Sequence, residues 1–561
     1  MKVVIIGGVA GGASAAARLR RLDENAEIII FERSGFISYA NCGLPYYISD
    51  VISDQSKLTL QTPESFFKRF NVIAKTSHEV INIHPEEKFV EVKNLKSNEV
   101  FKESYDKLIL SPGAKAIVPP FVKSNGKVFT LRTVEDALKI KSFIKDNNVK
   151  SAVVIGGGFV GVEMAENLKH LGIDVSLVEL NSQVLSMLDS DMVSFVHSTL
   201  KSNGIKLFLN NKVNDIQEKD NQVITVLDNN SITSDMVILA IGVTPDSNLA
   251  EIAGLQLGLK GSIIVNEHME TSKKDIYAVG DAIEVKNVIT EERTLIPLAG
   301  SANKQGRIVA DNIVGINSEY NGSLGTSIIK VFDLIVASTG INEIVCKKNN
   351  LKYEKVILSP QSHAGYYPNA KVLTLKVIYE KVTHRILGAQ IIGYDGVDKR
   401  IDVLATAIKA NMKATELKEL ELSYAPPFNS AKDPVNLAGL IIDNIENGLV
   451  KQFHYEDIEE LRKDPNVILL DTRTDFEYSK GYAEGFRHIP VDVLRSRLDE
   501  LDKTKKIFVM CQSGLRSYIS TRILVQHGYD AYNFAGGYRL YSSIFENQKM
   551  AKEQFNCGMD K

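Results

Sequence analysis

The chain contains no tryptophan and only four cysteines among its 561 residues. The cysteines are widely spaced and form no CxxC pair, which argues against a disulfide framework and against a cysteine-based metal site. We see no apolar run long enough to cross a membrane and no signal peptide before the first predicted strand. The net charge of −3 gives no general attraction to nucleic acid or to membranes. We therefore expect a cytoplasmic protein with individual thiols and no metal.

The length of the chain is too great for one hydrophobic core. Domains usually contain about 100–200 residues, so we expect about three or four of them. Two glycine-rich turns, each between a predicted strand and a predicted helix, indicate that two of these domains bind nucleotides. The predicted elements of these two units are strands 2–6, 27–31, 151–155 and 175–178 and helices 13–22 and 162–171.

The first glycine-rich turn follows the strand that opens the chain. Gly7 would form the tight turn, and Gly12 would let helix and strand approach, so that the helix N-terminus can hold a pyrophosphate. Glu32, after the second strand, would accept hydrogen bonds from a ribose. Val9 stands where the fingerprint has its middle glycine, so this motif is incomplete and is weak evidence when taken alone.

The second turn has the complete GxGxxG pattern, from Gly156 to Gly161. Glu179, at the end of the following strand, would bond the ribose 2′-hydroxyl and repel a 2′-phosphate. Residues 180–182 supply no arginine or lysine to hold such a phosphate, which favours NADH over NADPH. Together the two units predict two bound nucleotides.

Three further segments, residues 108–114, 239–245 and 276–282, end strands and lead the chain between the two units. Asp281 in the last of them would bond the ribityl chain of a flavin. With these segments, residues 1–445 resemble the pyridine nucleotide-disulfide reductases, in which an NAD(P)H domain interrupts an FAD domain and a dimerisation domain follows. The expected parts are an FAD domain (1–112 and 245–322), an NAD(P)H domain (113–244), a dimerisation domain (323–445), a linker (446–452) and a last domain (453–561).

The segment of residues 38–46 contains Cys42 with no second cysteine within a loop's reach. A free cysteine is often a buried structural residue, but the polar neighbours and the adjoining nucleotide motif favour a reactive thiolate here. A single cysteine in this segment resembles the coenzyme A-disulfide reductase branch, not the branch with a CxxxxC pair. Residues 363–368 and 423–436 also match that branch.

The resemblance implies a homodimer in which Tyr366 and Tyr424 reach the Cys42 site from the partner subunit. The alternative is that both tyrosines are ordinary interface or core aromatics. Arg18 and Arg21, three residues apart on one helix face, could clamp the phosphates of coenzyme A, or could form a solvated basic face. The resemblance adds further expected coenzyme A contacts: Ser14, Ser38, Asn41, Asn303, Arg307 and Lys432. The expected FAD and NAD(P)H contacts are Gly7, Gly8, Ala10, Gly11, Gly12, Glu32, Arg33, Asn41, Ser111, Pro112, Gly113, Arg132, Gly156, Gly157, Gly158, Phe159, Val160, Gly161, Glu179, Gly242, Gly280, Asp281, Leu298 and Ala299.

A second chemically suggestive cysteine, Cys511, lies between a predicted strand (507–510) and a predicted helix (518–527). Loop amides that point inward before a helix N-terminus would lower the pKa of such a thiol. Residues 453–552 resemble a rhodanese domain, which implies that Cys511 carries a persulfide and that Arg516 braces the loop. Cysteine-dependent phosphatases have a loop one residue longer. Tyr482 and His488 depart from the usual rhodanese residues, and an inactive rhodanese-like scaffold is the alternative.

We therefore expect an α/β chain with two Rossmann-like dinucleotide-binding domains, an α+β dimerisation domain and a C-terminal α/β rhodanese domain. The predicted function is FAD-dependent NAD(P)H reduction of coenzyme A disulfide, coenzyme A persulfide or polysulfide. Cys42 would form a mixed disulfide with coenzyme A, Cys511 would relay sulfane sulfur, and Tyr424 with Tyr366 would protonate the leaving thiolate.

One alternative is an NADH peroxidase or oxidase of the same fold, whose cysteine cycles through sulfenic acid. Those relatives carry a histidine in the first glycine turn, where this chain has Ala10. Another alternative is a sulfur carrier or redox sensor without catalysis. Cys346 and Cys557 receive no role.

Overall fold

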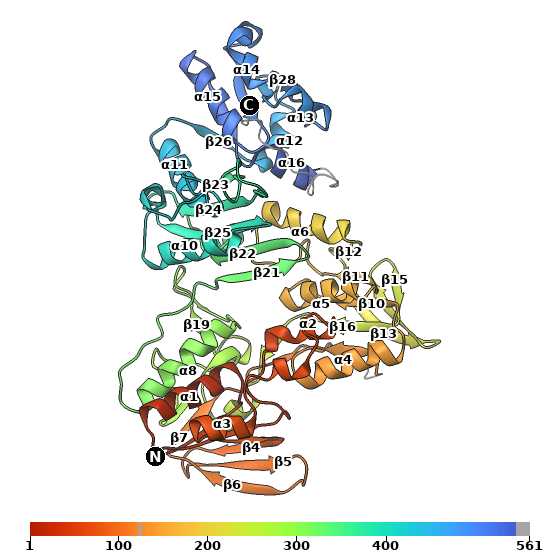
Figure 1. Ribbon diagram of the computed structural model, residues 1–561, viewed down its shortest axis with the longest axis vertical. Coiled ribbons are helices and arrows are strands. Elements are labelled where there is room, and N and C mark those ends of the chain that lie inside the picture. The colour runs from red at the N-terminus through yellow and green to blue at the C-terminus, as the bar shows by residue number, and fades with distance from the viewer. Residues whose placement is uncertain (123–125, 546–561) are drawn as a thin grey trace. The chain divides into compact units, whose positions relative to one another are not determined.

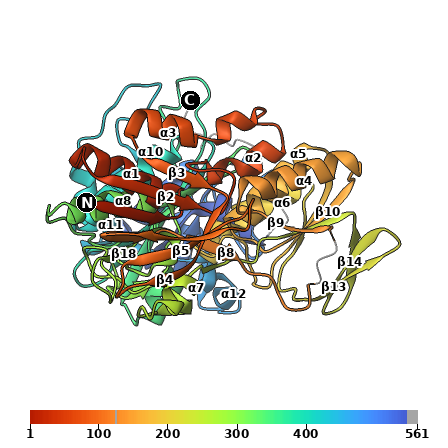
Figure 2. The same cartoon turned by 90° about the horizontal axis from the view of Figure 1, so that it is seen from below.

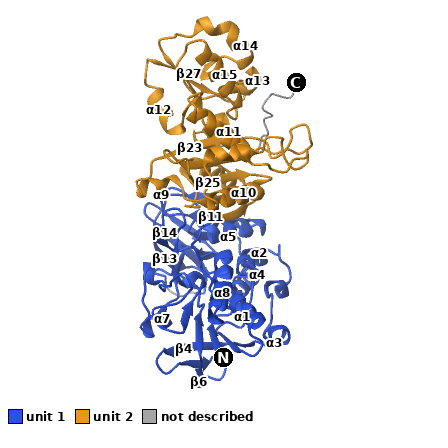
Figure 3. Cartoon of the chain, turned by 90° about the vertical axis from the view of Figure 1, so that its left-hand side faces the viewer, with its two compact units in different colours: residues 1–184, 205–325 blue, residues 185–204, 326–561 orange. Residues whose placement is uncertain are grey.

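The computed structural model describes residues 1–122 and 126–545, and Cys557 lies outside them. The chain divides into two compact units (Figure 3), one of residues 1–184 and 205–325 and one of residues 185–204 and 326–561. The predicted α/β fold class is confirmed. Among the described residues, no helix is long and apolar enough to span a bilayer.

The first sheet of unit 1 contains five parallel strands in the order β18-β7-β1-β2-β3. The central residues of β1 are fully buried, as apolar runs in parallel sheets usually are. Helices α1 and α8 pack against each other (Figures 1 and 2). The elements of this part are β1 (Lys2–Ile6), α1 (Ala10–Leu22), β2 (Glu27–Glu32), α2 (Leu44–Ile48), α3 (Pro63–Phe70), β3 (Ile73–Thr76), β4 (His78–His84), β5 (Phe89–Asn94), β6 (Val100–Ser104), β7 (Lys107–Leu110), α7 (Asn248–Ile252), β18 (Ile276–Ala278), β19 (Val285–Lys286), β20 (Arg293–Thr294) and α8 (Ala299–Ile313).

The second sheet of unit 1 is also parallel, in the order β12-β11-β10-β16-β9. It repeats the strand-turn-helix-strand arrangement of the first sheet. The elements of this part are β8 (Ala114–Ala116), β9 (Val128–Thr130), α4 (Val134–Asp146), β10 (Ser151–Ile155), α5 (Phe159–His170), β11 (Asp174–Val178), β12 (Lys206–Phe208), β13 (Val213–Lys219), β14 (Gln222–Leu227), β15 (Ser231–Ser234), β16 (Met236–Leu239) and β17 (Val243–Pro245).

Both helices that follow the glycine turns begin three residues earlier than the sequence predicts, at Ala10 instead of residue 13 and at Phe159 instead of residue 162. The last glycine of each motif therefore lies inside the first helical turn. A Cβ atom on Gly161 would lie 1.8 Å from the carbonyl oxygen of Gly156, so glycine is required for this close approach. The helix expected at 518–527 likewise begins earlier, at Leu515.

Unit 2 contains an antiparallel sheet in the order β21-β22-β25-β24-β23 and a parallel sheet in the order β26-β30-β29-β27-β28. Its elements are α6 (Ser190–Ser202), β21 (Ser327–Val331), β22 (Leu334–Gly340), α9 (Glu343–Lys348), β23 (Tyr353–Leu358), β24 (Thr374–Glu380), β25 (Ile386–Gly393), α10 (Val397–Lys409), α11 (Pro434–Glu446), β26 (Lys451–Phe453), α12 (Ile458–Leu461), β27 (Val467–Asp471), α13 (Asp475–Ser479), β28 (Arg487–His488), α14 (Val491–Leu494), β29 (Lys506–Met510), α15 (Leu515–Gln526), β30 (Ala531–Phe534) and α16 (Gly537–Phe545).

Helix α6 belongs to unit 2 although its residues lie within the segment expected to form the NAD(P)H domain. A buried charge cluster holds its first turn. The ammonium nitrogen of Lys376 on β24 lies 2.9 Å from Asp189 Oδ2, 2.8 Å from Asp191 Oδ2 and 2.5 Å from Glu343 Oε1. Although burial opposes the charged form, the three carboxylates keep the pKa of Lys376 above its ordinary value.

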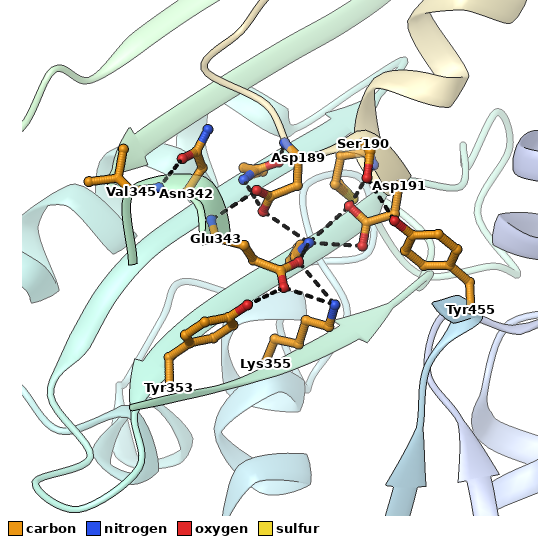
Figure 4. Close-up of polar contacts among 12 residues, drawn as sticks. Asp189, Ser190, Asp191, Asn342, Glu343, Val345, Tyr353, Lys355 and Tyr455 are labelled. Carbon is orange, nitrogen blue, oxygen red and sulfur yellow. Dashed lines mark hydrogen bonds and ion pairs between the residues drawn. The ribbon is translucent and has the colours of Figure 1, made fainter. Parts of the chain in front are cut away.

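The same cluster reaches the start of the last domain (Figure 4). Lys355 on β23 contacts Glu343 at 3.0 Å, and the hydroxyl of Tyr455 lies 2.7 Å from that of Ser190. Lys355 also contacts Glu456 at 2.7 Å. The three carboxylates around Lys376 lie close enough together to hold a cation. The ammonium group already supplies the positive charge there, so the cluster serves packing and not metal binding.

The first prediction concerns this cluster. We expect Lys376→Met to lower the free energy of unfolding by about 3–5 kcal/mol, because it leaves three buried carboxylates without their counter-ion. Chemical denaturation followed by circular dichroism measures the change. Lys381→Met is the control, since Lys381 pairs with Glu354 on the surface and its loss should change little. Equal stability of the two variants would contradict the prediction.

Candidate active site

The first glycine turn is held against the end of strand β2 by a buried carboxylate. The amide of Gly8 donates to Glu32 Oε2 at 2.8 Å, and the amide of Ser34 donates to Oε1 at 2.9 Å. Burial raises the pKa of Glu32, and the two amide donors oppose this effect. A Cβ atom on Gly7 would lie 2.1 Å from the carbonyl oxygen of Ser111. This arrangement of turn, helix N-terminus and strand-end acid fits a dinucleotide.

Several of the other residues expected at the flavin follow strands of the first sheet, and others come from the end of β9 and the start of α8. Arg132 Nη2 donates to Asp281 Oδ2 at 3.1 Å, next to Gly280. The amide of Gly280 donates to Gln305 Oε1 at 2.8 Å, a contact that the sequence did not reveal. Leu298 and Ala299 form the N-cap and first residue of α8, Pro112 and Gly113 follow β7, and Arg33 pairs with Asp246 at 2.8 Å.

The second glycine turn repeats the first. The amide of Gly157 donates to Glu179 Oε2 at 2.6 Å. Glu179 Oε1 accepts from the amide and the side chain of Asn181, at 2.8 and 2.7 Å. A Cβ atom on Gly156 would meet the carbonyl oxygen of Ala240 at 2.3 Å, whereas one on Gly158 would meet nothing within 4 Å. The turn therefore leaves open space at the N-terminus of α5, where a second dinucleotide fits.

Cys42 lies in the short turn Asn41–Gly43 that leads into α2, and its side chain is exposed. Partial removal of water from the sulfur, together with the carboxylates of Glu163 and Asp281, raises the pKa of this thiol. Arg132 opposes the shift. The chain's own groups therefore favour the protonated thiol, whereas the sequence led us to expect a thiolate.

Glu163 is a residue that the sequence analysis missed. It lies on α5, two residues after the second glycine motif, and accepts a hydrogen bond from the hydroxyl of Tyr46 at 3.2 Å. Burial raises the pKa of Glu163 to about 7. The hydroxyl of Ser49 donates to Asn167 Oδ1 at 2.5 Å and adds a second link between α2 and α5. An acidic residue in an otherwise apolar stretch was the available signal for Glu163.

Four of the residues expected at coenzyme A meet between α1 and α8. The hydroxyl of Ser14 donates to Asn303 Oδ1, and Arg18 Nε lies 2.7 Å from Asp311 Oδ1. Arg307 lies 4.0 Å from the same carboxyl group. Asp311, which the sequence did not reveal, thus draws the basic side chains together, while Arg21 is exposed. Ser38 stands at a positive φ of 44° beside the glycine turn, where its amide donates to the carbonyl oxygen of Gly8.

Tyr366 and Tyr424 lie in unit 2, with Lys432 exposed in the loop that precedes α11. Their hydroxyl oxygens are 2.9 Å apart, and this hydrogen bond raises the pKa of Tyr366. The side chains are 73% and 49% exposed. In the single chain they are therefore not core residues, and an ordinary interface position stays open as the alternative to a catalytic role.

Cys511 is fully buried at the carboxyl end of β29. Its sulfur accepts from the amide of Gly514 at 3.1 Å and from the hydroxyl of Ser517 at 3.3 Å. Arg516 donates to both oxygens of Glu477, at 2.7 and 2.6 Å. Burial raises the pKa of Glu477, but the contact with Arg516 outweighs this effect and keeps that pKa below its ordinary value. The loop thus directs donors at the sulfur and is braced by an ion pair to α13.

The departures from the usual rhodanese residues are accommodated by stacking. The ring of Tyr478 lies 5.1 Å from that of Tyr482 and 4.1 Å from that of His488, with interplanar angles of 19° and 9°. The amide of Tyr538, after the glycine pair at 536–537, donates to the carbonyl oxygen of Cys511 at 2.7 Å. The loop around Cys511 is therefore intact and supported.

Comparison with known families agrees with this geometry. Residues 1–306 match the pyridine nucleotide-disulphide oxidoreductases, residues 326–434 their dimerisation domain and residues 454–543 the rhodanese-like domain. The chain belongs to the pyridine nucleotide-disulphide oxidoreductase family. Membership implies FAD and NAD(P)H as cofactors, and the dimerisation domain indicates a homodimer.

Individual members of the family show how far the likeness extends. A coenzyme A disulfide reductase of Staphylococcus aureus is 40% identical over 442 residues, 78% of this chain and 99% of that protein. The reduced CoADR-RHD of Bacillus anthracis is 49% identical with a TM-score of 0.93, over 97% of this chain and 98% of that one. An NAD-dependent persulfide reductase from A. fulgidus is 36% identical with a TM-score of 0.91, over 96% and 100%.

The second prediction follows from the surroundings of Cys42. We expect Glu163→Gln to lower the pKa of the Cys42 thiol, because it removes a carboxylate that opposes the thiolate. The rate of alkylation by iodoacetamide as a function of pH measures this pKa. The alkylation rates of the variant and the parent should differ mainly above about pH 7, where Glu163 is charged.

Tyr46→Phe is the matched control for Glu163→Gln. It removes the hydrogen bond to Glu163 but keeps the carboxylate, so the pKa of Cys42 should not fall. Identical alkylation profiles for Glu163→Gln and the parent would show that Glu163 does not act on the sulfur.

Proposed function

We propose that the chain is an FAD-dependent reductase that cleaves the S–S bond of coenzyme A disulfide, coenzyme A persulfide or polysulfide with electrons from NADH. The observation that carries this proposal is that Cys42 is the only cysteine in residues 1–345. Thiol–disulfide exchange needs a second sulfur, which the substrate must then supply. The names of the relatives in Staphylococcus aureus, Bacillus anthracis and A. fulgidus support the same substrate class.

In the proposed reaction the Cys42 thiolate attacks one sulfur of the substrate. With coenzyme A disulfide or coenzyme A persulfide, the substrate S–S bond breaks and a bond forms between Cys42 and the coenzyme A sulfur. The other sulfur leaves as a thiolate from the disulfide, or as hydrosulfide from the persulfide. Sulfur from polysulfide would enter as coenzyme A persulfide. When bound at the first and second glycine turns, FAD and NADH supply the electron pair that restores the Cys42 thiolate. Asp281 and Arg132, paired at the strand ends, would orient the flavin side of the site.

The leaving sulfur takes up a proton, and we assign its donation to Tyr424 with Tyr366 behind it. The hydrogen bond between the two hydroxyls lets one tyrosine replace the proton given by the other. Both belong to the segment that matches the dimerisation domain, and we propose that they act on Cys42 of a partner subunit. Coenzyme A would be held beside Cys42 by residues of α1 and α8, namely Ser14, Arg18, Asn303 and Arg307.

The rhodanese-like domain gives Cys511 the part of a sulfur carrier. A persulfide on Cys511 would pass its outer sulfur to the coenzyme A thiolate, which yields coenzyme A persulfide and the Cys511 thiolate. The Gly514 amide and the Ser517 hydroxyl, which point at the sulfur, would stabilise that thiolate. We place this chemistry in the cytoplasm, where small thiols are kept reduced.

Anaerobic NADH oxidation with coenzyme A persulfide, coenzyme A disulfide, polysulfide and hydrogen peroxide tests the proposal. We expect Cys42→Ser to abolish turnover with every sulfur substrate. Cys511→Ser should keep the activity with coenzyme A disulfide and slow polysulfide reduction in the presence of coenzyme A. Turnover with peroxide alone would instead indicate a peroxidase, and polysulfide reduction by Cys511→Ser at the parent rate would refute the relay.

A separate prediction concerns the choice of NADH. Glu179 would accept from the ribose 2′-hydroxyl and repel a 2′-phosphate. We expect Glu179→Ala to shift the ratio of kcat/KM for NADPH over NADH by about tenfold or more toward NADPH, since one lost hydrogen bond to a charged group is worth about 1.5–3 kcal/mol. Asn181→Ala is the control, because it keeps the carboxylate and removes one of its donors. An unchanged ratio in Glu179→Ala would contradict the assignment.

A further inference from the structure

The hydrogen bond between Tyr366 and Tyr424 joins two loops that are far apart in the sequence. Tyr366 lies in the loop of residues 359–373 between β23 and β24, and Tyr424 lies in the loop of residues 420–433 that leads into α11. Loops held only at their ends sample many conformations. To keep two exposed hydroxyls 2.9 Å apart, both loops must be held by contacts with buried residues.

Arg400, on α10, is 1% exposed and bonds to both loops. Its Nη2 donates to the carbonyl oxygen of Ser362 at 2.6 Å, in the first loop, and to Asn429 Oδ1 at 3.0 Å, in the second. Its Nε donates to Asp433 Oδ2 at 3.1 Å, and its Nη1 donates to the carbonyl oxygen of Gly396 at 2.8 Å. One planar guanidinium group thus contacts both tyrosine loops and the start of α11.

Asn429 completes the connection, and it is as buried as Arg400. Its Nδ2 donates to the carbonyl oxygen of Ser423, the residue before Tyr424, at 3.2 Å. The main-chain carbonyl oxygen of Asn429 accepts from the amide of Ala364, two residues before Tyr366, at 3.1 Å. Asn429 therefore forms hydrogen bonds within two residues of each tyrosine, one through its side chain and one through its backbone.

The end of the second loop is fixed by the same group. Asp433, the partner of Arg400, is the N-cap of α11 and accepts from the amide of Val435 at 2.8 Å. Gly396, which has a φ of +67°, leaves room for the guanidinium group, since a Cβ atom there would lie 2.0 Å from Arg400 Nη1. A buried ion pair of this kind adds little net stability over apolar packing, whereas its directed hydrogen bonds define one geometry.

We propose that Arg400 and Asn429 are positioning residues that hold Tyr366 and Tyr424 at hydrogen-bond distance for proton delivery. The inference rests on the proposed function, in which the tyrosine pair protonates the leaving sulfur. Neither residue touches the substrate in this assignment. They act through the two loops, so their loss should affect proton delivery and leave electron entry from NADH intact.

Asn429→Asp in the full-length, FAD-loaded protein tests this inference. The carboxylate still accepts from Arg400 but cannot donate to the carbonyl oxygen of Ser423, so the second loop loses its tie. We expect kcat for coenzyme A disulfide to fall about ten- to 100-fold, as a small misplacement of a catalytic group does. KM for NADH and the NADH oxidation rate with ferricyanide, which takes electrons from the flavin without Cys42, should not change.

A double-variant comparison separates positioning from general destabilisation. If Asn429 acts only through the tyrosines, Asn429→Asp combined with Tyr424→Phe should be no slower than Tyr424→Phe alone. Asn312→Ala is the matched control, since the Asn312 amide also ties backbone carbonyls together, at His268, Ile308 and Ser318, in unit 1. It should keep kcat. All rates are compared per bound FAD.

The outcomes distinguish the positioning role of Asn429 and Arg400 from the proposed catalytic role of the tyrosines. Full kcat in Tyr424→Phe would refute the role of the tyrosines. A slow Tyr424→Phe with a normal Asn429→Asp, or additive effects in the double variant, would refute the positioning role alone. If Asn429→Asp binds too little FAD to assay, Arg400→Lys carries the same expectations, because it keeps a positive charge beside Asp433 and loses the forked donors.

Discussion

A redox-active disulfide within the protein requires two cysteine thiols, and residues 1–345 contain one cysteine. This constraint governs the rest of the reductase. Without a second cysteine beside Cys42, the site must bind a substrate that brings its own sulfur and must hold that substrate long enough for the mixed disulfide to be reduced. The contacts between α1 and α8 suit this need. Ser14 bonds to Asn303 there, and Arg18 and Arg307 both lie at Asp311. A phosphate-bearing thiol is the kind of substrate that such a basic cluster can retain.

In the proposed function unit 2 contains the second reactive cysteine, Cys511, in a domain that is held by contacts of its own. The Lys376 cluster fixes α6 to the antiparallel sheet, and Lys355 extends it to Glu456 at the start of the last domain. The rhodanese-like part is therefore packed onto the dimerisation sheet and is not merely linked to it by the chain. In the proposed relay, sulfur transfer would depend on a small carrier that moves, and a pantetheine thiol would provide one.

The sequence was sufficient for the elements and the cysteines but not for the partners that tune them. Strands such as Ser151–Ile155 were predicted residue for residue, because apolar β-branched runs beside glycine turns leave little choice. Helix starts were missed by three residues, since the motif glycines enter the first turn. Glu163, Asp311 and Glu477 were missed altogether. Each acts on a residue 39 to 293 positions away in the chain, at a distance that only the fold brings together.

Cys42 shows the physical reason most clearly. Its sequence neighbours are polar and suggested a thiolate, yet burial raises the pKa of its thiol, and the carboxylates of Glu163 and Asp281 add to this effect. Asp281 was expected near the flavin, but no local pattern reveals Glu163. The expectation for the tyrosines rests on the likeness of whole segments and not on isolated residues, and it stays a prediction.

The two reactive cysteines differ in a way that gives the proposed sulfur transfer a direction. Two donors, an amide and a hydroxyl, point at the sulfur of Cys511, whereas burial and the carboxylates of Glu163 and Asp281 disfavour the thiolate of Cys42. Donors stabilise a thiolate and make it a good leaving group, which suits a residue that gives its sulfur away. A raised pKa makes the Cys42 thiolate scarcer but more nucleophilic once it forms. Opposite electrostatic surroundings thus suit one cysteine to release sulfur and the other to attack it, with coenzyme A as the shared intermediary.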